Sequence, residues 1–184
     1  MFWKKKVKIQ LKSPSQDRSR NTVTEILNAC AKLIINEGFF SVTTDKIAKE
    51  ANVSIGSLYQ FFGNKESVVS ALIHNLLEND LRYFEENTKN ILTLPKEEIA
   101  RKIISVGIDI YKTHRELRSK IQTVQIYLTD TTFYQTTMKQ YQMFITQFIT
   151  PKPGISPETT AFVIVNAFLG VMNTISLENK NLDQ

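Results

Sequence analysis

The chain has one cysteine and two histidines in 184 residues, and each scarcity argues against a class of protein. The single cysteine, Cys30, cannot form a disulfide within the chain, so a reducing compartment such as the cytoplasm is expected. His74 and His114 are far apart in sequence, and neither stands beside a cysteine or carboxylate at metal-ligand spacing. No glycine-rich phosphate loop is present. We therefore expect no metal site, no cofactor and no enzymatic activity.

Glycine and proline are also few, six and five residues, and they fall between blocks of helical periodicity. No segment alternates polar and apolar residues for long, and 42% of the chain is apolar, which suffices for a packed core. These features predict an all-α fold. The expected helices run from Asn21 or Thr22 to Glu37, from 43 or 44 to 51, from 55 to 61 or 62, and over 64–89, 95–113, 115–128, 131–149 and 157–177.

The net charge of +5 is carried entirely by the first third of the chain. Residues 1–66 contain eleven Lys or Arg against six Asp or Glu, whereas residues 67–184 contain twelve of each. We expect a basic flexible arm over residues 1–20, and the positive charge up to residue 66 suits contact with phosphate groups. A secretory signal is disfavoured because no adequate apolar run follows the first lysines. A membrane-surface segment using Phe2 and Trp3 is the alternative for the arm.

The stretch 41–66 predicts two short helices joined by a tight turn. Thr43 or Thr44 can cap the first helix, and Asn52 tolerates the left-handed conformation that would end it. Ser54 can cap the second helix, and Gly63 is expected to stop it. The second helix is predicted to bury Leu58 and Phe62 and to leave a short polar face of Gly56, Ser57 and Gln60.

The run T-x-x-x-I-A-x-x-A-x-V-S-x-G-x-L-Y-x-x-F-x-x-K-E, from Thr43 to Glu66, resembles the helix-turn-helix of the tetracycline-repressor (TetR/AcrR) family of transcription regulators. The resemblance implies a homodimeric, sequence-specific repressor that binds a near-palindromic duplex operator and leaves it when a small-molecule effector binds. It also implies a helix-turn-helix DNA-binding domain over residues 21–66 and a helical effector-binding and dimerisation domain over 67–184. Phosphate contacts are expected from Thr44, Ser54, Tyr59 and Lys65. Base contacts in the major groove are expected from Ile55, Gly56, Ser57 and Gln60.

Residues 131–149 are unusually rich in aromatic and Met side chains, which suit an adaptable small-molecule pocket, although core packing alone also explains such a stripe. The pocket is predicted to be lined by Phe84, Tyr111, Tyr134, Met138 and Tyr141. A further glycine, Gly107, is expected to mark close helix packing rather than a ligand contact.

Residues 157–177 are apolar nearly all round, so this helix would face its own core on one side and a second copy of the chain on the other. The dimer interface is expected to include Phe162, Asn166 and Gly170. The helix is interpreted as too short, and too broken by Asn166, to span a membrane.

Family members commonly have one more helix after this one, and the sequence predicts none. Two alternatives therefore stand beside the repressor reading. In the first, residues 67–184 serve only for dimerisation or protein interaction, without a ligand. In the second, the chain pairs with longer relatives and blocks their DNA binding.

Overall fold

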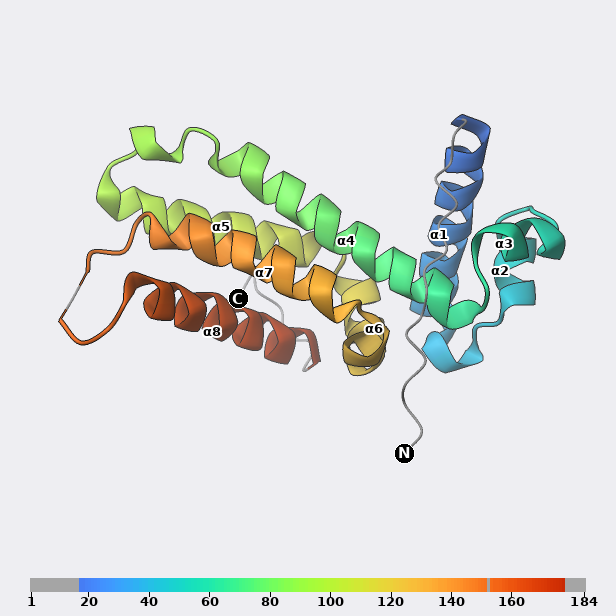
Figure 1. Ribbon diagram of the computed structural model, residues 1–184. Helices are drawn as coiled ribbons and strands as arrows, with labels where there is room; N and C mark the ends of the chain where they lie inside the picture. The colour runs from blue at the N-terminus through green and yellow to red at the C-terminus, as the bar shows by residue number, and fades with distance from the viewer. Residues whose placement is uncertain (1–16, 152, 178–184) are drawn as a thin grey trace. The chain divides into compact units, whose positions relative to one another are not determined.

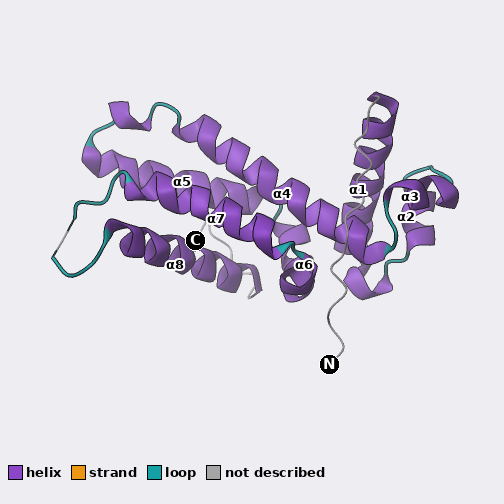
Figure 2. Ribbon diagram, in the orientation of Figure 1, coloured by secondary structure: helices purple, strands orange, loops and turns teal. Residues whose placement is uncertain are grey.

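The computed structural model describes residues 17–151 and 153–177, and there the chain is all-α (Figures 1 and 2). No strand occurs in this described part, which confirms the predicted fold class. The helices are α1 (Asp17–Glu37), α2 (Thr44–Glu50), α3 (Ile55–Phe61), α4 (Lys65–Thr88), α5 (Lys96–Thr113), α6 (Arg115–Leu128), α7 (Thr131–Thr146) and α8 (Pro157–Leu177). Two short 3-10 turns, η1 (Phe39–Ser41) and η2 (Ile91–Thr93), precede α2 and α5.

The chain divides into two compact units. The first extends to Asn75 and includes Lys120–Thr129, and the second contains Leu76–Ser119 and the residues from Asp130 onward. The first unit therefore continues beyond the boundary expected at residue 66. The reason is packing, because Val68, Val69 and Ile73 on α4 are at most 1% exposed and belong to the core of the first unit.

The core of the first unit is built on the apolar stripe of α1. Ile26, Cys30 and Ile34 are fully buried, and Leu58 of α3 is equally inaccessible. Burial raises the pKa of the Cys30 thiol to about 12, an effect that the nearby charge of Lys65 only partly opposes. Cys30 is therefore a packing residue with an unreactive thiol.

The second unit is organised around the pairing of α7 and α8, which run side by side (Figure 1). Met138 on α7 and Met172 on α8 are among its buried residues. Gly107 on α5 lies against Phe168 on α8, and a Cβ added there would stand 2.6 Å from Phe168 Cζ. Gly107 therefore serves close helix packing, as predicted.

Several helix boundaries differ from the predicted ones. α1 begins at Asp17, so residues 17–20 of the expected arm are helical, and residues 1–16 lie outside the described part. The polar run 17–20 has no apolar periodicity that could have shown this. Extended Phe62, rather than Gly63, ends α3, and α7 ends at Thr146 instead of Ile149. Beyond Thr146 the backbone hydrogen bonds join residues three apart instead of four. Gln147 N donates to Phe144 O, and Phe148 N donates to Ile145 O.

The expectation that α8 is too short to span a membrane is wrong by length and composition, because Pro157–Ser176 is long and apolar enough. Core helices of globular proteins can have the same length and composition. α8 packs along α7 with one side, where Ala161 and Met172 are buried. Its other side exposes apolar residues, namely Phe162, Val163, Ile164 and Val171.

Gly107→Ala is expected to lower the free energy of unfolding by ~1–3 kcal/mol, because the new methyl group would overlap the ring of Phe168. Urea denaturation followed by circular dichroism measures the change. Gly63→Ala is the control, since a Cβ there meets no atom within 4 Å. Equal stability of the two variants would contradict the packing role.

Candidate nucleic-acid interface and effector site

The start of each short helix in the first unit is fixed by a side-chain cap. Thr43 caps α2 by accepting from Lys46 N at 3.3 Å, and Ser54 caps α3 by accepting from Ser57 N at 3.0 Å. Asn64 caps α4, accepting from Ser67 N at 2.8 Å while its own N–H is bonded to Ser67 Oγ at 3.2 Å. The predicted capping roles of Thr43 and Ser54 are confirmed.

The turn between α2 and α3 depends on Asn52, whose φ of 53° makes it the one non-glycine residue with positive φ in the described part of the chain. Asn52 N donates to Lys49 O at 3.2 Å, and Val53 N donates to Ala48 O at 3.0 Å. These two bonds form a Schellman motif, which satisfies carbonyls at the end of α2 and reverses the chain into α3. The left-handed residue predicted from the sequence is confirmed.

α3 presents the polar face that the sequence predicts. Leu58 and Phe62 are buried, whereas Ile55, Gly56 and Gln60 are exposed. Ser57 is half-buried, and its hydroxyl lies 2.8 Å from Ser54 Oγ. The residues expected to read bases therefore lie on an accessible surface.

Two of the expected phosphate-binding hydroxyls are brought together. Thr44 Oγ1 on α2 and Tyr59 Oη on α3 are 3.1 Å apart and hydrogen-bonded, and the Tyr59 side chain remains half-exposed. A phosphate oxygen placed beside them could accept from one or both, because each hydroxyl can reorient its proton. The pair also links the two helices of the motif directly.

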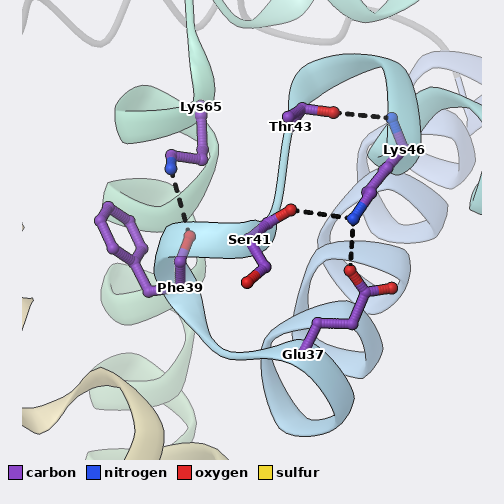
Figure 3. A network of polar contacts seen from close by, with 6 residues as sticks. All are labelled: Glu37, Phe39, Ser41, Thr43, Lys46 and Lys65. Atoms are coloured by element: carbon purple, nitrogen blue, oxygen red, sulfur yellow. Dashed lines mark hydrogen bonds and ion pairs between the residues drawn. The ribbon is translucent and has the colours of Figure 1, made fainter.

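Lys65 is held within the first unit. Its ammonium donates to Phe39 O at 3.1 Å and lies 4.2 Å from the centroid of the Phe39 ring (Figure 3). Ammonium carries three donors, so the bond to Phe39 O leaves others for a phosphate. This anchoring contact was not predicted, since nothing in the periodicity of α4 points toward Phe39.

A second lysine joins α1 to the segment before α2. Lys46 Nζ donates to Glu37 Oε2 at 2.5 Å and to Ser41 O at 3.0 Å (Figure 3). Because both charged side chains are more than a third exposed, the ion pair itself contributes little to stability. Its effect is geometric, since it fixes the segment that delivers Thr43 and Thr44.

The residues predicted for an effector pocket all lie in the second unit. Phe84 and Tyr141 contact each other edge to face, with ring centroids 5.1 Å apart. The Tyr111 hydroxyl donates to Asn173 Oδ1. Tyr111 and Tyr134 interact electrostatically, and burial raises the pKa of both phenols. Met138 is buried.

Sequence reasoning missed a buried ion pair beside these rings. Arg118 Nη2 donates to both oxygens of Asp80, at 2.7 and 2.6 Å, and the two side chains are only 13% and 9% exposed. Burial raises the pKa of the Asp80 carboxyl, although the Arg118 charge and hydrogen bond act in the opposite direction. The sequence did indicate that Asp80 is buried, because Asp80 is four residues from both Leu76 and Phe84 on the buried face of α4.

No group of three or more His, Cys, Asp or Glu side chains suited to a metal ion occurs among residues 17–151 and 153–177.

Comparison with known proteins agrees with this geometry. The family model described as "Bacterial regulatory proteins, tetR family" matches residues 26–72, which run from the middle of α1 through the two short helices into the first part of α4. The chain belongs to the TetR family. It is accordingly a DNA-binding transcriptional regulator, and its identified relatives are regulators rather than enzymes.

Individual TetR-family relatives match over most of the chain. The HTH-type transcriptional regulator YhgD of Bacillus subtilis is 28% identical over 171 residues, covering 86% of each protein. The structure of FadR from Bacillus halodurans superimposes with a TM-score of 0.69 at 16% identity, covering 86% of this chain and 85% of FadR. The structure of TetR from Rhodobacter sphaeroides gives a TM-score of 0.62 at 19% identity, covering 84% of this chain and 88% of that one. At these identities the two structures establish a common fold.

Asn52→Ala is expected to destabilise the TetR-type motif by ~1 kcal/mol, because the left-handed conformation costs alanine more free energy than it costs asparagine. Asn52→Gly is the matched control and should leave the protein as stable or more so, since glycine adopts positive φ freely. Urea denaturation of the three proteins measures the effect. Equal losses from both substitutions would show that the Asn52 side chain, rather than its backbone conformation, matters.

Proposed function

We propose that this regulator is a homodimeric repressor that leaves its operator when a small molecule binds to the second unit. The observation that carries the DNA half of the proposal is the hydrogen-bonded hydroxyl pair of Thr44 and Tyr59 beside the accessible face of α3. This pair offers phosphate donors next to side chains able to reach base edges. Such a protein acts in the cytoplasm, where the DNA is.

Each residue of the interface has an assigned task. Thr44, Ser54, Tyr59 and Lys65 contact phosphates and set the register of α3. Gln60 can read adenine through its amide, and Ile55 can contact a thymine methyl group. Gly56 lets the helix backbone approach the groove, and Ser57 offers an adaptable hydroxyl. In this assignment the phosphate contacts supply affinity, and the base contacts supply specificity.

One seven-residue helix contacts few base pairs, so tight and specific binding requires a second copy. The exposed apolar side of α8, which includes Phe162 and Val171 at 55% and 56% exposure, suits an interface between two copies. Asn166 and Gly170 lie on the same helix and are exposed. We favour a protein partner over a lipid bilayer because polar Asn166, Asn173 and Thr174 are also exposed on α8.

The effector half of the proposal rests on the second unit. Its aromatic contacts, from Phe84 to Tyr141 and to Phe144, combine apolar surface with a few polar groups, as small-molecule sites do. We propose that DNA binding lies within residues 21–66 of the first unit, and that effector binding and dimerisation lie within 67–184, in the part that belongs to the second unit. A body that only dimerises is the second candidate, and the exposed face of α8 is the observation that favours it.

Gln60→Ala is expected to relax sequence preference at one position of each half-site by ~1–3 kcal/mol, because it removes a base contact. Operators are first selected from a pool of randomised duplexes with the full-length protein, and affinities are then measured by fluorescence anisotropy. Tyr59→Phe is the comparison, since loss of a phosphate-binding hydroxyl should weaken all sequences alike. Lys65→Met should lower the salt dependence by about one released counterion per subunit. A Gln60→Ala protein with unchanged sequence preference would contradict the assigned groove contacts.

Phe162→Glu is expected to shift the protein from dimer to monomer at micromolar concentration, because it places a charge within the apolar side of α8. Sedimentation equilibrium measures the mass. Ile126→Glu on α6 is the control, since Ile126 is 80% exposed and belongs to no proposed interface. Retention of the dimer by Phe162→Glu would assign dimerisation to another surface.

A further inference from the structure

The buried ion pair of Asp80 and Arg118 uses only part of the hydrogen-bonding capacity of the arginine. Both bonds to the Asp80 carboxylate come from a single nitrogen, Arg118 Nη2. The guanidinium carries five N–H donors, and its Nε is buried without an acceptor among the residues that the structure describes. Buried donors are normally satisfied, so this one calls for an explanation.

The surroundings of Arg118 favour an organic ligand. Its guanidinium carbon lies 5.2 Å from the centroid of the Tyr111 ring, and Tyr111 and Tyr141 both interact electrostatically with Asp80 and Arg118. The Tyr111 hydroxyl is already engaged by Asn173. Apolar rings and the unpaired Arg118 Nε donor therefore occur together in this part of the second unit.

The charge balance of the pair limits what such a ligand can carry. Asp80 and Arg118 neutralise each other, and the pKa of nearby His114 is lowered by burial and by Arg118, against the opposing effect of Asp80, which favours its uncharged form. An anion at Nε would leave an uncompensated negative charge next to Asp80, and a cation would compete with Arg118 for the carboxylate. An uncharged acceptor satisfies the donor without either cost.

We propose that Arg118 Nε donates to an uncharged oxygen acceptor of the effector, such as an ester, amide or ketone carbonyl, on an aromatic or aliphatic body that packs on Tyr111 and Tyr141. The inference rests on the proposed function, since it names the chemical class of the ligand that the second unit takes. Asp80 and Arg118 then remain paired in the bound state, and selectivity comes from the single donor.

The test uses the full-length protein labelled with nitrogen-15, in which the Nε–H signal of Arg118 is identified by its loss in Arg118→Lys. The probes are matched triads, in which each aromatic ring is supplied as a methyl ester, a carboxylate and a methylammonium compound. We expect esters to shift the Arg118 Nε–H signal and to bind ~10-fold more tightly than the charged members, because a carboxylate adds an uncompensated charge beside Asp80 and an ammonium group cannot accept the hydrogen bond.

Arg118→Lys keeps a positive charge for Asp80 but has no Nε donor, so it should lose ~10-fold of the ester affinity. Arg101→Lys on α5, at an exposed position, should lose none. If Arg118→Lys does not fold, the signal of the unmodified protein decides the question. Tighter binding of carboxylates or ammonium compounds, or an Nε–H signal that no ester shifts, would overturn the assignment.

A second measurement, release of a selected operator, tests this inference and the proposed function separately. An ester that shifts the Arg118 signal but leaves operator binding unchanged would support this inference and refute effector-controlled release. A charged compound that releases the operator without moving the Arg118 signal would support release and refute this inference.

Discussion

A single backbone constraint, the left-handed conformation of Asn52, determines how α3 is presented. The two Schellman bonds around it, from Asn52 N and Val53 N, leave α2 and α3 no room to change their relative direction without breaking backbone hydrogen bonds. Buried Leu58 and Phe62 then fix which side of α3 faces inward. The hydrogen bond between Thr44 and Tyr59 joins the two helices across this turn, so the hydroxyls that we propose as phosphate ligands depend on the turn as well as on their own helices.

The contacts of Lys65 and Lys46 have the same consequence at the edges of the motif. Lys65 ties the start of α4 to Phe39, and Lys46 ties the segment before α2 to the end of α1. Exposed ion pairs contribute little free energy, yet a side chain bonded to a backbone carbonyl restricts where the following residues can lie. The positive charge of the first third of the chain is therefore partly structural, and only the remainder is available to attract DNA.

Local chemistry explains what the sequence could predict. Caps at Thr43 and Ser54, the turn at Asn52 and the buried stripe of α1 follow from side-chain type and helical spacing within a few residues. The contact between Lys65 and Phe39 joins residues 26 positions apart, and that between Asp80 and Arg118 joins residues 38 apart, so no local pattern could specify the partner. Asp80 could still have been singled out as an acid on an apolar face. Residues 17–20 gave no periodic signal because all four are polar.

The position of Asp80 and Arg118 in the chain connects the ion pair with the proposed regulation. α4 and α6 each contribute residues to both compact units, and Asp80 and Arg118 lie within five residues of the points where those helices pass from one unit to the other. A buried ion pair is seldom the most stabilising choice at such a place, since apolar side chains of similar volume often stabilise as well or better. What the pair provides instead is directionality, because its geometry tolerates little displacement of one helix relative to the other. A ligand that bonds to Arg118 would contact α6 directly and α4 through Asp80, and it would shift a conformational equilibrium only as far as it bound the two states with different affinity.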